Sequence, residues 1–531
     1  MFDPMLMADF YKLSHPKQFP AGAEYVYSNT TPRSSRLEGV NAVVVFGLQY
    51  LVEEYLIKNW NENFFSKPKD LVIKKFKRIV DSTLGPNSVD TKIFEDLHDL
   101  GYLPVHIKSL PEGTLCPIQV PFMTIVNTDP RFYWITNFLE TLTQTVIWQA
   151  ITSATIAREY KILLNKYAEL TSSAPDFVTW QGHDFSMRGM SSVESGAVSG
   201  AAHLLSFTGT DTITAIEFLE KYYGADVEKE LVGGSVPATE HAVMCAGGAG
   251  IDNEYETYRR IIEDVYPTGI ISLVSDTWDF YAVLRRILPA LKSKIMGRNG
   301  KVVIRPDSGD PVKIVTGYFP INVKYTSEDL LVRAASDSFV MKLFNGDHDC
   351  VKTIDGKYFD NEFNELTEDE VKGAVQILFE EFGGTKNEKG YIELDPHIGL
   401  IYGDSITYRR CEQICERLEA KGFASTNLVY GIGSYTYQYV TRDTFSIACK
   451  ATWVQINGKS ESIFKDPKTG ASKKSAKGLL SVVKDGGTLK LLNDCTPDQE
   501  ASGELITIFK NGVQHNKQSL SDIRKIVKES L

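Results

Sequence analysis

The sequence lacks most of the short signatures that identify an enzyme class on their own. It has no GxxxxGK[ST] phosphate loop and no GxGxxG loop that opens a helix after a strand, so the usual nucleotide fingerprints are absent. The spacings HExxH and paired CxxC do not occur, and neither does a GxSxG nucleophile elbow. The sequence therefore gives no reason to expect a zinc site or a serine hydrolase.

Membrane, disulfide and nucleic-acid features are also missing. No run approaches the ~20 apolar residues of a membrane helix, and the N-terminal residues lack the basic and long apolar segments of a secretory signal. The seven cysteines are an odd number scattered over 531 residues, which is unlike a disulfide framework. Cys411 and Cys415, one turn apart on a predicted helix, are expected in the core. We expect a soluble cytoplasmic protein.

Basic residues are fewer than acidic ones. The net charge of −11 argues against a broad nucleic-acid surface, because a phosphate backbone needs a clustered basic face. A local anion pocket needs only a few placed cations, so such a pocket stays possible in this sequence.

What the sequence does contain, from about residue 175, is a repeated unit of strand, turn and helix. Short apolar segments end in turns of Gly, Ser, Thr or Asp: LLSFTGT (204–210), GIISLVS (269–275), VVIRPDSGDP (302–311), HIGLIYGD (397–404) and STNLVYGIGS (425–434). This repetition predicts an α/β fold with a parallel sheet, open or closed into a barrel. In such folds the chemistry lies at the carboxyl ends of the strands.

The remaining segments have a different pattern. Residues 1–150 mix short strands with helices, and 132–170 predict long helices. Residues 326–390 are acidic and rich in loops, as expected of an insertion. Residues 451–531 return to short strands and end in an amphipathic helix, SLSDIRKIVKES (519–530).

The turn RPDSGDP combines Arg305 with Asp307 and Asp310 at the end of a predicted strand. Carboxylates accept hydrogen bonds from sugar hydroxyls or hold Mg²⁺, and a guanidinium binds an anion, so the turn suits a phosphorylated sugar. A β-turn with a surface ion pair explains the same residues equally well.

Two glycine turns and a set of cations are candidates for phosphate binding. YGDS (402–405) and GIGS (431–434) allow close backbone approach to a ligand, although turn chemistry alone also explains them. The cations that follow are Arg442, Lys450, Lys465, Lys473, Lys474 and Lys477. They form either a pyrophosphate site or, for the 473–477 run, a solvated face.

Two further side chains, His241 and Phe185, have two interpretations each. His241 follows Glu240 and suits a base, a ligand or a phosphoryl acceptor, but a lone histidine is more often structural. Phe185 lies near Arg188, and the two could stack on a flat heteroaromatic ring, although core packing is the default for Phe185.

Taken in order, the segments are far more specific than any one of them. They include DFYKLSHPKQFP, FGLQYL, NTDPRFYWITNFLET, HDFSMRGMSS, AAHLLSFTGTDT, SVPATEH, SLVSDTWDFY, IRPDSGDP, YGDS, VTRD and IFKDP. From about residue 8 to the end, this series resembles the nicotinamide phosphoribosyltransferase family of dimeric type II phosphoribosyltransferases. The resemblance implies synthesis of nicotinamide mononucleotide and pyrophosphate from nicotinamide and phosphoribosyl pyrophosphate in NAD salvage, with Mg²⁺ and stimulation by ATP.

The resemblance also implies an architecture. It predicts an irregular, TIM-like α/β barrel over 151–450, interrupted by the insertion near 326–390. A second α+β domain would combine 1–150 with 451–531. It further implies a homodimer with two active sites at the subunit interface.

Site residues follow from the resemblance one at a time. Phe185 and the partner's Tyr11 resemble the pair that sandwiches the pyridine ring, with Arg188, Asp211 and Ser272 near the base. Arg305, Asp307, Gly403 and Asp404 match ribose-side positions, and Gly433 and Ser434 match the 5′-phosphate loop. Arg33, Arg442, Lys450 and Lys465 match anion-binding residues. His241 matches the histidine that ATP phosphorylates, with Glu240 and Asp276 as its partners.

Other functions stay open from the sequence. Nicotinate phosphoribosyltransferase shares the fold and the cosubstrate. A non-catalytic binding protein on the same scaffold and a barrel enzyme of unrelated chemistry are the alternatives from other classes.

Overall fold

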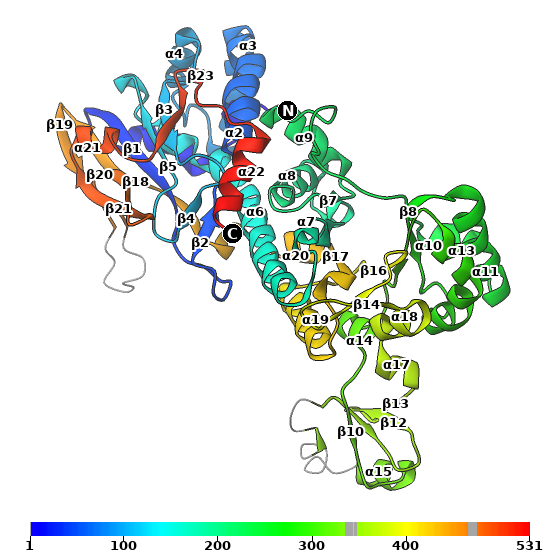
Figure 1. The fold of residues 1–531 in the computed structure, drawn as a ribbon. Coiled ribbons are helices and arrows are strands. Elements are labelled where there is room, and N and C mark those ends of the chain that lie inside the picture. Colours follow the sequence, from blue (N-terminus) through cyan, green and yellow to red (C-terminus); the bar gives the residue numbers. More distant parts are fainter. Residues whose placement is uncertain (1, 335–342, 345–347, 466–474) are drawn as a thin grey trace.

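The computed structural model describes residues 2–334, 343–344, 348–465 and 475–531 (Figure 1). Lys473 and Lys474 of the predicted cation set lie outside the described residues. Among the described residues all seven cysteines are free, and Cys411 and Cys415 are buried, so the prediction that these two pack in the core is confirmed. No helix of the described chain is long and apolar enough to cross a bilayer.

A curled sheet of six parallel strands forms the centre of the molecule. In spatial order its strands are β7 (Gly209–Thr210), β6 (Gly182–Asp184), β17 (Leu428–Ile432), β16 (Ile398–Tyr402), β9 (Gly300–Arg305) and β8 (Gly269–Val274). The apolar runs in β8 and β16 become buried strands, as expected for a sheet covered on both faces. All six carboxyl ends therefore lie along one rim of the sheet.

This curled parallel sheet and its helices confirm the predicted mixed α/β class. Closure of the sheet into a barrel stays a prediction. Helices follow most strands, as the sequence predicts: α9 (Ile213–Tyr223), α12 (Phe280–Ala282), α13 (Leu288–Gly297), α14 (Pro311–Thr316), α19 (Tyr408–Ala420) and α20 (Ser434–Tyr437). Between β7 and β8 the chain forms α10 (His241–Ala246) and α11 (Ile251–Arg260). Apart from α9, whose buried apolar side chains belong to a separate cluster, these helices and the sheet share one large apolar core.

One predicted strand is wrong over most of its length. LLSFTGT (204–210) was expected to be a short apolar strand that ends in a turn, but α8 (Val193–His203) ends just before it and β7 comprises only Gly209–Thr210. Leu204, Leu205 and Phe207 are buried in a turn, where they fill core space. An apolar run of this length does not distinguish a strand from a buried turn.

A long helix joins this sheet to the rest of the molecule. Helix α6 (Glu140–Thr171) places Ile147 and Ile151 in one apolar core and Ile156 and Leu164 in another. The buried residues of α6 therefore lie on more than one face of the helix. This explains why apolar residues are dense over 132–170, where the sequence predicts long helices. Figure 1 shows the helix running between the two halves of the molecule.

The second large sheet combines strands from both ends of the chain. Its order is β19 (Lys459–Ser462), β18 (Ile447–Ile456), β1 (Ala23–Pro32), β5 (Met123–Asn127), β3 (Val105–Ser109), β22 (Ile506–Lys510) and β23 (Val513–Gln514). Helices α3 (Lys69–Leu84) and α4 (Lys92–Leu100) contribute to its core. The amphipathic C-terminal helix is present as α22 (Leu520–Glu529). The domain boundaries near 150 and 450 stay a prediction, and α6 and β18 run across those positions.

The segment predicted as an insertion carries a small sheet of its own. Strands β10 (Pro320–Asn322), β11 (Cys350–Lys352), β12 (Tyr358–Asp360) and β13 (Glu365–Leu366) pair in that order, beside α15 (Ser327–Arg333). Figure 1 shows this part projecting from the main body. Asp349 fixes its base, because it accepts a hydrogen bond from Phe319 and pairs with Arg417 of α19.

Candidate active site

A cavity of about 670 Å³ opens beside the carboxyl ends of β6, β7 and β9. Five residues predicted from the sequence line it together: Phe185, Arg188, Asp211, Glu240 and Arg305. Phe185 follows β6, Asp211 follows β7 and Arg305 ends β9. The parallel sheet therefore brings residues that are up to 120 positions apart to one rim, as the strand–turn pattern predicts.

Asp211 is held by two donors within this cavity. His183 Nε2 lies 2.9 Å from Asp211 Oδ1, and the Ser235 hydroxyl donates to the same oxygen at 2.5 Å. Burial alone would raise the pKa of Asp211, but the hydrogen bonds from His183 and Ser235 outweigh it and lower that pKa. Asp211 is therefore a carboxylate at neutral pH, and its side chain keeps 43% of its exposure toward the cavity.

Phe185 provides the flat apolar wall of the cavity. The Arg305 guanidinium lies 6.0 Å from the Phe185 ring centroid and donates to the Thr239 carbonyl at 3.0 Å. Behind the ring is Gly431, where a Cβ atom would lie only 2.7 Å from the Phe185 ring. A side chain at Gly431 would push the ring out of place, so this glycine is a packing requirement of β17.

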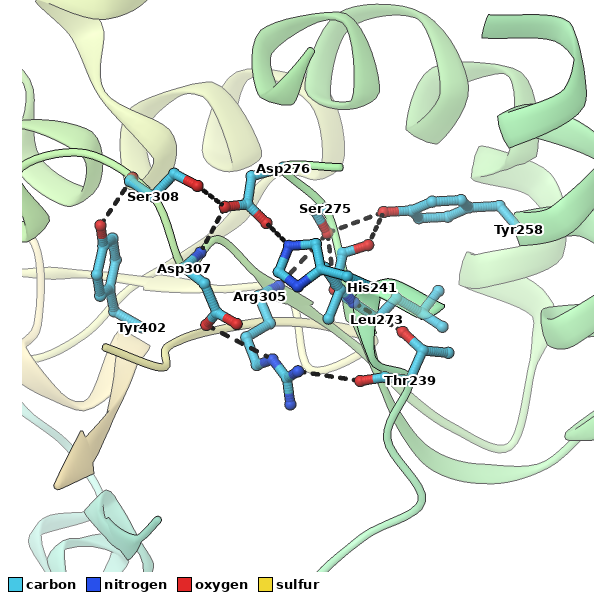
Figure 2. A network of polar contacts seen from close by, with 11 residues as sticks. Thr239, His241, Tyr258, Leu273, Ser275, Asp276, Arg305, Asp307, Ser308 and Tyr402 are labelled. Carbon is cyan, nitrogen blue, oxygen red and sulfur yellow. Dashed lines mark hydrogen bonds and ion pairs between the residues drawn. The ribbon is translucent and has the colours of Figure 1, made fainter. Parts of the chain in front are cut away.

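Beside the cavity, His241 and two aspartates form one polar network (Figure 2). His241 Nε2 lies 3.3 Å from Asp276 Oδ1, while Asp276 Oδ2 accepts from the Asp307 backbone N–H at 3.0 Å and the Ser308 hydroxyl at 2.5 Å. Burial works against the charged form of Asp276, but these donors and His241 lower its pKa. The nearly buried Asp276 thus joins the half-exposed His241 to the RPDSGDP turn.

Asp307 has the opposite electrostatic environment. Its burial raises the pKa, and Arg305 only partly opposes that effect from 3.7 Å away. Among the described residues neither Asp307 Oδ1 nor Arg305 Nε has a hydrogen-bond partner, although both atoms are buried. These two groups are therefore open to partners that a ligand would supply.

The two glycine turns lie close to the same network. A Cβ atom on Gly403 would lie 2.1 Å from Asp307 Oδ1, and one on Gly189 would lie 2.0 Å from Ser434 Oγ. These close approaches place the YGDS turn against Asp307 and the GIGS turn against the loop that carries Arg188. Asp404, by contrast, is exposed and accepts from the Ser405 hydroxyl. No side-chain approach constrains Gly433.

The predicted cations lie elsewhere in this single chain. Arg442 and Tyr11 line a separate cavity of about 280 Å³ beside α6. Lys450 belongs to β18 of the second sheet, Arg33 follows β1 and donates to the Ser446 carbonyl, and Lys465 is exposed. One chain therefore does not bring these five residues into the cavity of Phe185 and Asp211. Ser272 also lies outside the cavity lining, since it is buried within β8.

Sequence reasoning missed the residues that support the predicted ones. His183, Ser235 and Thr239 hold Asp211 and Arg305, yet none was singled out. His183 has a recognisable signal, because it lies in the strand that leads directly to Phe185, and side chains two residues apart in extended chain point to the same side. Ser235 and Thr239 lie in an irregular segment, where the sequence carries no comparable signal.

Among the described residues, no group of three or more His, Cys, Asp and Glu side chains could hold a metal ion. Asp307 Oδ1 has no hydrogen-bond partner among the described residues, so Asp307 is a candidate to contribute one oxygen to Mg²⁺.

Comparison with known proteins gives two family matches. Residues 180–513 match the nicotinate phosphoribosyltransferase (NAPRTase) family, and residues 4–107 match the nicotinamide phosphoribosyltransferase N-terminal domain. A nicotinamide phosphoribosyltransferase from Acinetobacter baylyi is 46% identical, over 100% of this chain and 98% of the relative. One from Mycoplasma pneumoniae is 31% identical, over 89% and 94%.

Solved structures with little sequence identity have the same fold. Human nicotinic acid phosphoribosyltransferase aligns with a TM-score of 0.50 at 13% identity, over 99% of this chain and 93% of that one. A nicotinate-nucleotide pyrophosphorylase from Pyrococcus furiosus aligns with a TM-score of 0.51 at 14% identity, over 99% and 95%.

Proposed function

The chain belongs to the nicotinate phosphoribosyltransferase family, and from this premise we propose that it joins nicotinamide to phosphoribosyl pyrophosphate. The products are nicotinamide mononucleotide and pyrophosphate, and the reaction serves NAD salvage. One observation carries the choice of base: an ionised Asp211 shares a cavity with the Phe185 ring. Full-length similarity to proteins named nicotinamide phosphoribosyltransferase supports the same choice.

The charge of Asp211 discriminates between the two pyridine bases. A carboxylate accepts a hydrogen bond from the carboxamide NH₂ of nicotinamide. It repels the carboxylate of nicotinate by about 1–4 kcal/mol at close range, depending on the local dielectric. A difference of about 1.4 kcal/mol already gives tenfold selectivity. Since His183 and Ser235 donate to Oδ1 and no described residue donates to Oδ2, the second oxygen can accept from the base.

The reaction needs positioning more than a side-chain nucleophile. The ring nitrogen of nicotinamide attacks the anomeric carbon as pyrophosphate leaves, through a transition state with positive charge on the sugar. Phe185 would hold the ring in plane, with Arg188 beside it. Arg305 Nε and Asp307 Oδ1, which lack hydrogen-bond partners among the described residues, would bind ribose hydroxyls or phosphate oxygens.

The ribose and phosphate sites would extend along the same rim. Gly403 and Asp404 would contact the ribose, and Gly433 and Ser434 the 5′-phosphate through backbone N–H groups. Mg²⁺ would neutralise charge on the leaving pyrophosphate. The described residues offer few oxygen ligands for Mg²⁺, so most of the coordination of Mg²⁺ would come from the substrate.

A homodimer would complete this site. Tyr11, Arg33, Arg442, Lys450 and Lys465 are separated from the cavity within one chain, so we propose that a second subunit supplies them. The partner's Tyr11 would then stack opposite Phe185, and the cations would hold the pyrophosphate.

The curled sheet would act as an irregular barrel. Gly234 forms an isolated bridge to Gly209 of β7, and Ala238 forms another to Ser272 of β8. The segment between these two residues therefore links both edges of the sheet without being a regular strand, and it carries Ser235 beside Asp211. We propose that this linkage gives the barrel its closure.

His241 would couple ATP hydrolysis to the reaction. The phosphoryl group of ATP would pass to a ring nitrogen of His241 as ADP leaves, with Asp276 orienting the ring and Glu240 nearby. A phosphohistidine adds negative charge at the pyrophosphate end of the site.

Seven free thiols suit a reducing compartment, so we also propose a cytoplasmic location.

Product analysis tests this function directly. The purified protein is incubated with phosphoribosyl pyrophosphate, Mg²⁺ and nicotinamide, with and without ATP, and the mixture is separated by chromatography. We expect nicotinamide mononucleotide and pyrophosphate in equal amounts. Consumption of neither substrate under any of these conditions would contradict the proposal.

A further inference from the structure

A second cavity lies at the opposite, amino ends of β6 and β7. Its volume is about 440 Å³, and it lies between α6, α7 (Val178–Gln181), the turn after α8 and α22. Phe207 and Thr208, which precede β7, line it, whereas Asp211 at the other end of the same strand lines the candidate active site. The two cavities share no lining residue.

Lys161 is the unusual residue of this second cavity. Its side chain is about nine-tenths buried, and among the described residues it makes no ion pair and no hydrogen bond. Its only described polar contact is with the face of Phe207, where Nζ lies 5.2 Å from the ring centroid. A buried ammonium without an anion is costly, so the site is electrostatically incomplete.

Two more cations line the cavity without a carboxylate partner in the described chain. Arg524 donates to the carbonyl groups of Leu204, Leu231 and Val232, which use its N–H groups but leave its charge uncompensated. Lys528, one turn further along α22, is exposed and makes no ion pair with any described residue. Glu169 and Asp176 also line the cavity, and neither lies within ion-pair distance of Lys161.

Neutral hydrogen-bond donors accompany these charges. Asn165 is one helical turn after Lys161 on α6, and its side-chain amide has no hydrogen bond among the described residues. Ser206 Oγ is buried and also lacks a partner in that part of the chain. The cavity thus combines unpaired cations with unsatisfied polar groups, which is the chemistry of an oxyanion site.

We propose that this cavity is a second anion-binding site, separate from the active site, which takes a phosphate group through Lys161, Asn165 and Lys528. A tetrahedral oxyanion offers several acceptor oxygens and more than one negative charge, which matches two lysines and the amide of Asn165. The volume also admits a phosphate monoester. The proposal does not depend on the reaction assigned to the other cavity.

The charge state of Lys161 supports this site and provides a readout. Burial and the nearby Lys528 lower the pKa of Lys161 to about 8, while Asp176 acts in the opposite direction. Near that pH a large fraction of Lys161 is an uncharged, reactive amine, unlike an ordinary lysine. A bound phosphate would favour the charged form and cover the amine, so it would slow chemical modification.

The test is reductive methylation of the full-length protein near pH 8, with each lysine followed by peptide mass spectrometry. Separate arms contain inorganic phosphate, ribose 5-phosphate or chloride at matched ionic strength. The protection factor is the methylation rate of Lys161 without ligand divided by the rate with ligand. It equals one plus the ratio of ligand concentration to Kd, so a phosphate ligand at about ten times its Kd slows the methylation of Lys161 about tenfold. Lys166 on the same helix is the internal control and should not respond.

Variants separate this site from the active site. Lys528→Gln should weaken the protection of Lys161 severalfold, while Lys525→Gln, on the same helix outside the cavity lining, should keep it. Arg442→Ala, which alters a cation assigned to the substrate, should also keep it. Equal methylation rates of Lys161 in phosphate, ribose 5-phosphate and chloride would overturn the proposal, and so would loss of protection in Arg442→Ala.

Discussion

His183 of β6 faces Asp211, which directly follows the neighbouring parallel strand β7, with His183 Nε2 2.9 Å from Asp211 Oδ1. A Cβ atom on Gly209, which pairs with His183 across the strands, would lie only 2.7 Å from His183 Nδ1. The missing side chain at Gly209 therefore allows the imidazole to reach Asp211. His183 is a positioning residue in this arrangement, since it acts on the base through Asp211.

Replacing His183 by leucine should lower kcat/KM for nicotinamide about tenfold, because a hydrogen bond to a charged group contributes roughly 1.5–3 kcal/mol. The donor lowers the pKa of Asp211, so its loss should raise that pKa. The acidic limb of the kcat/KM profile should then move to higher pH, since Asp211 must be ionised to accept from the carboxamide.

The matched control for this variant is His515→Leu, which replaces an exposed histidine near the second sheet. Its pH profile should coincide with that of the unaltered protein. An acidic limb that does not move in His183→Leu would show that His183 does not control the charge of Asp211.

Gly403→Ala should inactivate the enzyme without unfolding it. The added Cβ would lie 2.1 Å from Asp307 Oδ1, so the carboxylate must move from its place beside Arg305. We expect kcat/KM to fall about 100-fold, as for other small displacements of a positioned group. Steady-state kinetics and thermal unfolding check this together, with Gly297→Ala as the control, since nothing lies within 4 Å of a Cβ at Gly297. Near-normal activity of Gly403→Ala would show that Asp307 has no role in the active site.

The sequence predicted the rim of the parallel sheet better than the residues that support it. Arg305, Asp307 and Gly403 were predictable, because strand ends in a parallel sheet meet at one edge. LLSFTGT was misassigned, since a buried turn and a buried strand have the same apolar composition. Ser235 and Thr239 lie in an irregular segment that joins the sheet through isolated β-bridges, and no local sequence pattern predicts such bridges.

His241→Ala should retain basal synthesis at reduced efficiency and lose stimulation by ATP. Its ring lies 3.3 Å from Asp276, which accepts a hydrogen bond from the Asp307 backbone, so a phosphoryl group on His241 would act through this network on the pyrophosphate end of the site. Initial rates with and without ATP, together with transfer of labelled γ-phosphate, provide the measurement. His98→Ala, on α4, should keep both properties. Full stimulation in His241→Ala would exclude the phosphohistidine.

Mixing two inactive variants should restore activity if the site spans two subunits. Tyr11→Ala and Phe185→Ala each disrupt one wall of the base site, and these walls belong to separate cavities of one chain. Random reassortment of a dimer yields half mixed dimers, each with one intact site, so recovery should reach about one quarter of full activity. The check is to co-refold or coexpress the two variants and assay them. No recovery in a sample with proven mixed dimers would contradict the shared site.

The most direct test of the account is the ratio of kcat/KM for nicotinamide to kcat/KM for nicotinate, measured for the unaltered protein and for Asp211→Asn. The account predicts a ratio above about ten, as expected from a repulsion of 1.4 kcal/mol or more. In Asp211→Asn the ratio should fall toward one, as nicotinamide use weakens and nicotinate use improves. An unaltered enzyme that prefers nicotinate, or a ratio that Asp211→Asn leaves unchanged, would contradict the account.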